Sequence, residues 1–342
     1  MISSASCNCL AFRRNKRVRI STVWCAIVAS IFSGCGDSPK APESAAPVSV
    51  PADLWKEFSG DKALELVRQQ VDFGPRPSGS AAIEKARQHI TETLVKNGWE
   101  VERQEFRETP VSGRGETVFA NIVGRFPATK GQPASRLTQR VIMGSHFDTK
   151  LMPVRFVGAN DAGSSTGALL EFSRVLALAP AFAQQFELLF FDGEEGVVGI
   201  SPNVESGPDG LVGSRYYAKQ VRERARQFRF AIVWDMIGDK ELTITLPNDT
   251  PPHLSGGIFK AAEQLGFRSK FGFAPGPILD DHEPIARIAR IPAMDIIDFN
   301  YTTTENQLWH TAADTMDKLS AESLEIVGRT TLKMLLNELG AK

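Results

Sequence analysis

Six short groups of polar residues in this sequence carry side chains that could bind a metal ion or move a proton. They are His146-Phe147-Asp148, Gly158-Ala159-Asn160-Asp161-Ala162-Gly163, Asp192-Gly193-Glu194-Glu195-Gly196, Asp235, Asp280-Asp281-His282 and Trp309-His310-Thr311. Their donor atoms are imidazole nitrogens and carboxylate oxygens, a mixture that suits zinc. Three protein ligands would leave one coordination position open, so the predicted chemistry is metal-assisted catalysis.

The adjacent pair Glu194 and Glu195 follows the apolar run 186–191. Carboxylates at the end of a buried strand are costly to bury without a partner, and a divalent cation would offset that cost. Successive residues that leave a strand can point in different directions, so one glutamate can bind metal while its neighbour faces a substrate. The unligated glutamate is then a candidate general base beside a Lewis acid.

Each group also has a structural explanation when it is taken alone. A Glu-Glu pair is usually a solvated loop, and His146 could be a hydrogen-bonded structural histidine. Asp161 could cap the helix that follows it. Asp281 and His282 could be turn residues before Pro284. Their joint occurrence at predicted strand ends favours the catalytic interpretation.

The elements that must position these residues alternate between strands and helices. Periodicity and capping predict helices over 61–71, 80–97, 166–178, 257–266 and 321–339. Alternation predicts a strand over 99–108, and mainly apolar segments predict strands over 118–125, 140–144, 186–192, 230–236 and 291–297. This order predicts an α/β fold whose central mixed, mostly parallel β-sheet is flanked by helices. Ligands bind beyond the carboxyl ends of such strands, which places the chemistry just after Met143, Phe191, Val233 and Ile297.

The order of the motifs HFD, GANDAG, DGEEG, WDMIGD, DDHEP and WHT resembles the co-catalytic zinc aminopeptidases and their relatives, the glutaminyl cyclases. The resemblance covers residues 60 to 340 and implies a zinc-peptidase-like three-layer fold. Carried over position by position, it implies that Asp161, Glu195 and His310 bind zinc and that Glu194 is the general base and acid.

Further roles follow from the same resemblance. Asp280 stands where the cyclases have an aspartate that hydrogen-bonds the catalytic glutamate, and Asp235 would also help to hold that glutamate. His146 and Asp235 stand where aminopeptidases bind a second zinc ion, although cyclases usually hold no metal there. Trp309 and Lys150 are predicted to contact the substrate.

Three features favour the cyclase branch. The stretch after the glutamates contains Ser201-Pro202 and then Asp209-Gly210-Leu211-Val212-Gly213-Ser214-Arg215, which is similar to a cyclase insertion that ends in a Gly-Ser-Arg helix start. Asp280 precedes Asp281, where aminopeptidases more often have Ser or Thr, and Trp309 precedes the predicted ligand His310. Two features depart from the animal-type cyclases, which carry a tryptophan near Ile200 and a histidine near Asp295. The loop from Asp295 to His310 is also longer, so the departures concern the substrate pocket more than the metal site.

The resemblance therefore implies a glutaminyl-peptide cyclotransferase that uses one zinc ion to convert N-terminal glutamine to pyroglutamate and release ammonia. The alternative is a zinc aminopeptidase, with two zinc ions and Glu194 as base, that releases N-terminal amino acids. A third interpretation is a catalytically inactive binding protein on a membrane surface, against which the complete ligand set argues.

The N-terminal segment differs from the rest of the chain. A basic stretch over 13–19 precedes a largely apolar run over 20–32 that is too short to span a bilayer comfortably. The following Ser33-Gly34-Cys35 resembles a bacterial lipoprotein signal, although a plain signal peptide or an uncleaved anchor is the alternative. We therefore expect a signal peptide over 1–35, a Pro-, Ala- and Ser-rich linker over 36–52 and a catalytic domain over 53–342.

The composition of the chain indicates which kinds of binding partner and which kinds of chemistry are expected. The 342 residues carry a net charge of −1 and are 42% hydrophobic, so no nucleic-acid partner is expected. All four cysteines lie at or before Cys35, which leaves no disulfide framework and no thiol nucleophile in the predicted domain. We expect a monomer that acts on peptides or proteins with a free N-terminus. It would be exported to the periplasmic or extracellular face of a bacterial cell envelope and held to the membrane by lipidated Cys35.

Overall fold

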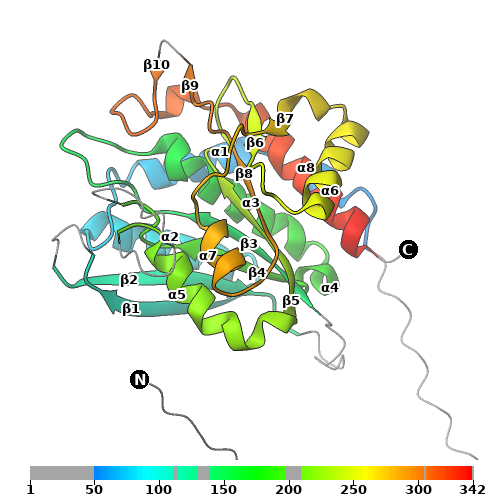
Figure 1. The fold of residues 1–342 in the computed structure, drawn as a ribbon, viewed down its shortest axis with the longest axis horizontal. Coiled ribbons are helices and arrows are strands. Elements are labelled where there is room, and N and C mark those ends of the chain that lie inside the picture. The colour runs from blue at the N-terminus through cyan, green and yellow to red at the C-terminus, as the bar shows by residue number, and fades with distance from the viewer. Residues whose placement is uncertain (1–49, 111–114, 129–138, 197–208, 304–305, 341–342) are drawn as a thin grey trace, which may run out of the picture. The chain divides into compact units, whose positions relative to one another are not determined.

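The computed structural model describes residues 50–110, 115–128, 139–196, 209–303 and 306–340 (Figure 1). The predicted signal peptide and the linker up to residue 49 lie outside these ranges, as do Ile200, Ser201 and Pro202. The elements below all belong to one compact unit, Pro47–Lys342. No helix in the described ranges has both the length and the apolar composition needed to cross a bilayer.

A six-stranded mixed sheet forms the centre of this unit, with the strand order β1-β2-β4-β3-β5-β8. Its strands are β1 Glu100–Glu108, β2 Thr117–Arg125, β3 Arg140–His146, β4 Phe186–Phe191, β5 Phe228–Asp235 and β8 Ala293–Ile297. The four strands from β4 to β8 run parallel, whereas β1 and β2 add an antiparallel edge. The fold class predicted from the sequence is confirmed.

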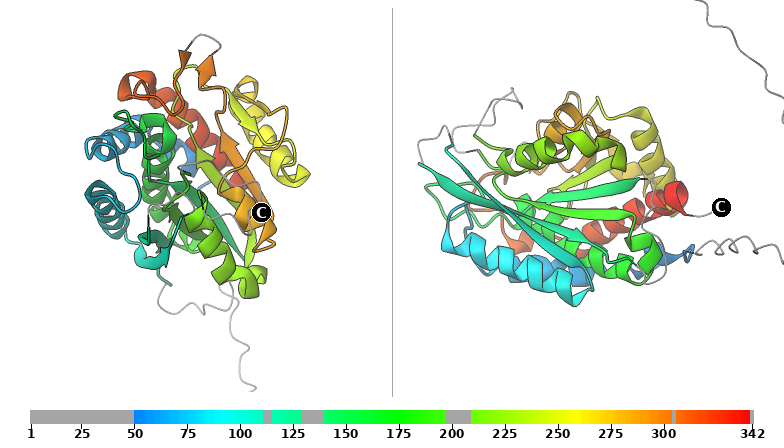
Figure 2. Two further views of the ribbon diagram at one scale, coloured as in Figure 1. Left: turned by 60° about the vertical axis from the view of Figure 1, so that its left-hand side comes forward. Right: turned by 90° about the horizontal axis from the view of Figure 1, so that it is seen from below.

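Helices cover both faces of the sheet, as Figure 2 shows. One face carries α1 Gly60–Val71, α2 Ala81–Lys96, α3 Ser165–Ala177 and α8 Ala321–Leu339, and α6 Pro252–Leu265 packs on α8. The other face carries α5 Val212–Val221 and α7 His282–Arg287. The remaining elements are α4 Pro180–Ala183, the paired strands β6 Ile244–Leu246 and β7 Phe271–Phe273, and the hairpin β9 Thr302–Thr303 with β10 Asn306–Gln307.

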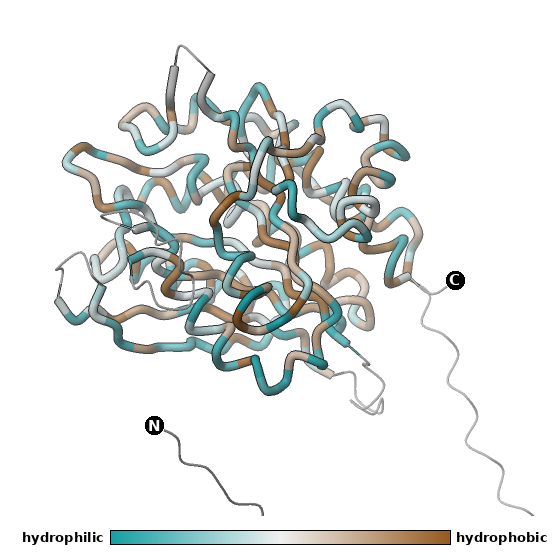
Figure 3. Tube along the Cα trace, viewed as in Figure 1, coloured by the Kyte–Doolittle hydropathy of each residue, from teal (hydrophilic) through white to brown (hydrophobic). Residues whose placement is uncertain are grey.

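The strand β4 explains why two cores form. Its residues Leu188 and Phe190 pack into the larger core with α1, α3 and α8, while Leu189 and Phe191 pack into the smaller core with α5 and α7. Alternate side chains of a strand point to opposite faces, so a continuous apolar run fills both layers. The hydrophobic colouring of Figure 3 is concentrated along these inner segments.

Local sequence signals set several helix ends. The Ser80 side chain accepts a hydrogen bond from the Ile83 amide and begins α2, and Gly266 ends α6 in the left-handed conformation. The prediction of a helix from residue 257 was too short, because α6 begins at Pro252, a favoured first position. The alternative that His282 lies in a turn is wrong, since it begins α7 and Pro284 fits in that helix's first turn.

Candidate active site

The parallel strands deliver the predicted residues to one edge of the sheet. His146 is the last residue of β3 and Asp235 the last of β5, while Glu194 and Glu195 follow β4 by a few residues. These four residues are at most 8% exposed. His310 reaches the same edge from the loop between β10 and α8.

The three residues predicted to bind zinc converge. Asp161, Glu195 and His310 each offer a ligand atom, and these atoms lie within 4.8 Å of one another. His310 Nε2 is 3.3 Å from Asp161 Oδ2 and 3.1 Å from Glu195 Oε2. Residues separated by up to 149 positions in the sequence therefore surround one point, which is the spatial arrangement that a shared cation requires.

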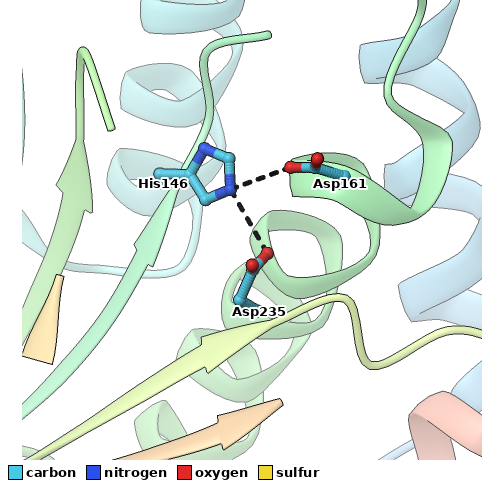
Figure 4. Close-up of side chains that lie close together, drawn as sticks. All are labelled: His146, Asp161 and Asp235. Carbon is cyan, nitrogen blue, oxygen red and sulfur yellow. Dashed lines mark hydrogen bonds and ion pairs between the residues drawn. The ribbon is translucent and has the colours of Figure 1, made fainter. Parts of the chain in front are cut away.

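A second group shares Asp161 with the first. His146 Nε2 lies 3.3 Å from Asp161 Oδ1 and 3.2 Å from Asp235 Oδ1 (Figure 4). The three ligand atoms of His146, Asp161 and Asp235 also lie within 4.8 Å of one another. Asp161 thus presents one oxygen to each group and stands between two potential cation positions.

The backbone around Asp161 is shaped to present its carboxylate. Gly158 has φ of 52°, and a Cβ atom there would lie 1.9 Å from the Asp161 carbonyl oxygen, so this close approach requires glycine. A π-helical turn, Ala159–Ser164, follows. Asp314 accepts hydrogen bonds from the backbone amides of Asn160 (2.8 Å) and Asp161 (3.2 Å). The turn that carries the shared ligand is therefore fixed from a segment about 150 residues away.

The two glutamates are held in the same manner. Asp148 accepts hydrogen bonds from the amides of Glu194 (3.1 Å) and Glu195 (3.3 Å), and it lies 3.5 Å from the His146 ring nitrogen Nδ1. The Leu211 amide at the start of α5 donates to the Glu194 carbonyl at 2.7 Å. Asp148 thus links the ends of β3 and β4 and orients residues of both predicted metal groups.

Arg76 stabilises the backbone on either side of the segment between β3 and Asp161. It is fully buried, and its guanidinium donates to the carbonyls of Phe147 (2.9 Å), Val157 (2.6 Å) and Gly158 (3.1 Å). Burial lowers the pKa of Arg76 to about 10, although nearby carboxylates such as Asp148 oppose that shift. One side chain therefore ties the segment after β3 to the segment that precedes Asp161.

The carboxylates open into a cavity of about 220 Å³. Apart from the predicted ligands and Glu194, its wall includes Asp235, Asp280, Ile297, Phe299 and Trp309. Trp309 stacks on the His310 ring with centroids 4.0 Å apart and lies 5.5 Å from Phe299. Trp309 is 40% exposed and Phe299 43%, so both rings keep surface free at this cavity.

The charges of the site influence one another strongly. Burial raises the pKa of Glu194 well above its ordinary value, and the carboxylates of Glu195 and Asp280 add to that effect. Burial also raises the pKa of Asp235, to about 7. Burial alone would lower the pKa of His310, but Asp161 and Glu195 outweigh it and raise the value to about 9. Such perturbed groups gathered in one cavity are typical of functional sites.

Asp280 and Lys150, which were also predicted as site residues, each lie close to one of the two glutamates. Asp280 lines the cavity together with Glu194, and its Oδ1 accepts the backbone amide of Asp281 at 2.5 Å. Lys150 lies beside a predicted ligand, because its Nζ is 3.5 Å from Glu195 Oε2 and its amide donates to Glu195 Oε1 at 3.2 Å. The catalytic role of Asp280 and the substrate contact of Lys150 stay predictions.

Sequence reasoning assigned no role to Asp148, Asp314, Arg76 or Phe299. Asp148 could have been found, because it follows His146 by two residues at the end of a predicted strand. Asp314 lies four residues after His310, which is a weaker signal. Phe299 could also have been found, because it follows the predicted strand end Ile297 by two residues. Arg76 lies far from the predicted motifs, so only the folded chain reveals its position.

The residues present fit a zinc ion. Asp161 Oδ2 is buried and has no hydrogen-bond partner in the described part of the chain. The donor set of one imidazole and two carboxylates is suited to zinc and leaves a coordination position toward the cavity. Glu194, next to this group, is not one of its three members.

Comparisons with known proteins show which family this chain resembles. Residues 121–335 match peptidase family M28. The glutaminyl-peptide cyclotransferase-like protein of Mus musculus is 28% identical over 322 residues, which is 85% of this chain and 76% of the mouse protein. An Acidobacteriales bacterium glutaminyl cyclase is 30% identical with a TM-score of 0.71, over 89% of this chain and all of that one. A Zn-dependent exopeptidase from Parabacteroides distasonis is 27% identical with a TM-score of 0.70, over 82% of this chain and 99% of that one.

The family match covers more than half of the chain and includes both glutamates, both predicted metal groups and the wall of the cavity. The resemblance inferred from the motifs is thereby confirmed. The chain belongs to peptidase family M28, in the zinc aminopeptidase superfamily that also contains the glutaminyl cyclases.

Proposed function

We propose that this protein is a zinc-dependent glutaminyl-peptide cyclotransferase, which converts an N-terminal glutamine to pyroglutamate and releases ammonia. The observation that carries the proposal is the position of Glu194. Its buried carboxyl group lies beside, but outside, the group formed by Asp161, Glu195 and His310. All four residues line one cavity, in a chain similar to proteins that bear the cyclotransferase name.

The size of the cavity supports a substrate with one compact reacting residue. Pockets for drug-sized ligands measure roughly 300–1,000 Å³. The cavity here measures about 220 Å³, which suits a single folded-back glutamine side chain. Trp309 and Phe299 would provide the apolar wall against which that side chain packs.

Asp161, Glu195 and His310 would hold the zinc ion. When bound, zinc supplies a Lewis acid that polarises the side-chain amide carbonyl. Glu194 accepts a proton from the α-amine as the amine nitrogen forms a bond to the amide carbon. Glu194 then returns that proton to the departing nitrogen, the carbon–nitrogen bond of the side-chain amide breaks, and ammonia leaves. No net proton is consumed, and the raised pKa of Glu194 suits a group that both accepts and donates.

Because nucleophile and electrophile belong to one residue, the protein mainly has to hold that residue in a folded conformation. Asp148 and the α5 amide of Leu211 keep the Glu194 backbone in place.

Aminopeptidase activity is the second candidate, and the group of His146, Asp161 and Asp235 is the observation that favours it. Glutamine β-naphthylamide distinguishes the two reactions in one assay. A cyclase yields pyroglutamyl β-naphthylamide and ammonia, whereas an aminopeptidase yields free naphthylamine and glutamine. Naphthylamine as the main product, with two zinc ions per chain, would reject the proposed function.

The roles of the two glutamates are tested by a matched pair of variants. Glu194→Gln is expected to keep zinc and lose about 100- to 10,000-fold in kcat, which is the usual contribution of general acid–base catalysis. Glu195→Gln is expected to lose zinc as well as activity. Zinc content by atomic absorption, measured beside kcat, separates them, and an active Glu194→Gln enzyme would show that Glu194 is not the base.

A further inference from the structure

A cluster of buried polar residues lies behind the catalytic cavity. It contains Asp280, His282 and Asp295, which are 3%, 5% and 0% exposed. Asp280 faces the cavity, Asp295 lies on β8 opposite Val233 of β5, and His282 begins α7. One ligand atom from each of the three lies within 4.8 Å of the others.

In the described ranges, three of the four carboxyl oxygens of Asp280 and Asp295 lack hydrogen-bond donors, whereas Asp280 Oδ1 accepts the backbone amide of Asp281. Both oxygens of Asp295 and the Oδ2 of Asp280 have no partner among the described residues. His282 Nδ1 is 3.8 Å from Asp295 Oδ2, which is too long for a hydrogen bond. One carboxyl oxygen of Asp280 and one of Asp295 lie within 4.8 Å of each other, and besides burial, hydrogen bonding between the two groups contributes to the raised pKa of Asp295. Two ionised carboxylates in such a place would repel each other without compensation.

The surrounding charges do not resolve this conflict. The acidic groups of Asp235 and Asp281 oppose ionisation of Asp295. Burial raises the pKa of Asp280, but the imidazole of His146 acts to lower it and so favours the ionised form of that residue. Burial, followed by the charges of Asp280 and Asp235, raises the pKa of Asp295 well above its ordinary value.

The nearest imidazole provides no positive charge either. Burial and then Arg287 lower the pKa of His282 to about 3, so His282 is neutral near pH 7. On α7, Arg287 is paired with Glu283 rather than with the cluster.

We propose that Asp280 and Asp295 share a single proton, and that Asp295 thereby acts as a positioning residue for the catalytic cavity. A protonated Asp295 donates to Asp280 and holds the Asp280 carboxylate in the cavity wall. The pair then carries one negative charge instead of two beside Glu194, which limits the repulsion on the proposed base. The effect on rate rests on the proposed function, whereas the shared proton does not.

Infrared difference spectroscopy of the full-length holoenzyme at pH 8 tests the proton directly. The wild-type minus Asp295→Asn spectrum is expected to contain the C=O band of a protonated carboxylic acid. Asp298→Asn is the matched control, because Asp298 is a buried aspartate near the end of the same strand, with its own donors from Thr243. Its difference spectrum should lack that band. Absence of the band from the Asp295→Asn difference would overturn the shared proton.

Steady-state kinetics with the glutamine substrate tests the positioning role. Asp295→Asn keeps a neutral donor and is expected to retain kcat within about threefold, while Asp295→Ala should lose about tenfold or more, as orienting partners of catalytic groups do. Equal rates for the two variants would reject positioning. Loss of a metal ion from zinc-replete Asp295→Asn would show a bound cation in place of the proton. Failure to form pyroglutamate would reject the proposed function, and the infrared result would still decide the shared proton.

Discussion

At the scale of single residues, the site depends on acceptors that hold ligand-bearing backbone in place. Asp314 is the strongest case, because it accepts the amides of Asn160 and Asp161 and also the Tyr301 hydroxyl at 2.9 Å. It has no exposed surface. Partners that orient metal ligands commonly change metal affinity by 10–100-fold when they are replaced. Asp314 should therefore control how well Asp161 binds zinc.

We predict that Asp314→Ala weakens zinc binding by about 10- to 100-fold, because the turn that carries Asp161 loses its fixed position. Competition with a chelator of known affinity measures this loss. Asp317→Asn is the matched control, since Asp317 lies in the same loop with a side chain that is 66% exposed. Equal zinc affinities for the two variants would contradict the role given to Asp314.

A second prediction concerns the pH dependence of stability. Asp298 is buried, and burial raises its pKa from 3.8 to about 6 despite donors from Thr243. Between these two values the folded state binds more protons than the unfolded state, so this group's contribution to stability falls as pH rises. The free energy of unfolding of the wild type minus that of Asp298→Asn should fall between pH 4 and pH 6, by on the order of 3 kcal/mol at most.

Urea unfolding of both proteins at a series of pH values measures this difference. Zinc release in acid affects both proteins equally and cancels in the comparison. A difference that stays constant, or that grows as pH rises from 4 to 6, would show that the folded state does not favour protonated Asp298.

At the scale of elements, the close packing of α3 on α1 supports the turn that carries Asp161. Gly167 in α3 allows this approach, because a Cβ atom there would lie 2.5 Å from Val67 Cγ2 and 2.9 Å from the Ala63 carbonyl oxygen. The turn Ala159–Ser164 leads directly into α3 and contacts α1 as well. Displacement of α3 should therefore reach the metal site as well as the core.

Gly167→Ala is expected to lower the free energy of unfolding by about 1–3 kcal/mol, since overpacking forces backbone shifts of that cost. Gly256→Ala is the control, because Gly256 lies inside α6 with no atom within 4 Å of the added Cβ. It should gain about 0.5–1 kcal/mol from helix propensity. Chemical denaturation measures both, and a Gly167→Ala protein as stable as the wild type would contradict the packing argument.

At the scale of the whole molecule, the catalytic unit is preceded by a segment with the pattern of a lipoprotein signal. Within this segment, Cys35 is the residue proposed to carry the lipid. Lipidation of Cys35 would hold the enzyme at a membrane, and the linker over 36–52 would then connect the lipid to the catalytic unit.

We predict that Cys35→Ala abolishes lipid attachment and moves the protein from the membrane fraction to the soluble fraction of a bacterial host. Labelling with radioactive palmitate and fractionation of the cells measure both effects. Cys25→Ala is the matched control, because Cys25 lies inside the apolar run and should leave labelling unchanged. Labelled Cys35→Ala protein would reject Cys35 as the lipidated residue.

Much of the fold could be read from the sequence because its strands have distinct local patterns. The run Phe186–Phe191 is apolar on both faces, and this predicted a buried strand whose end carries the glutamates. The strand and helix order then fixed which strand ends meet. The resemblance carried by the motifs implied that Asp161, Glu195 and His310 converge, and their side chains do meet.

The sequence by itself thus determined the fold class and the chemical types at the site, since both depend on local residue patterns. Only the tertiary structure decided which buried acceptor holds which amide. The hydrogen bond from Asp161 to Asp314 joins residues 153 positions apart, and Asp280 and Asp295 meet only because α7 returns to β8. Such pairings arise because buried polar groups must find partners in space, and no local pattern encodes which partner lies nearest.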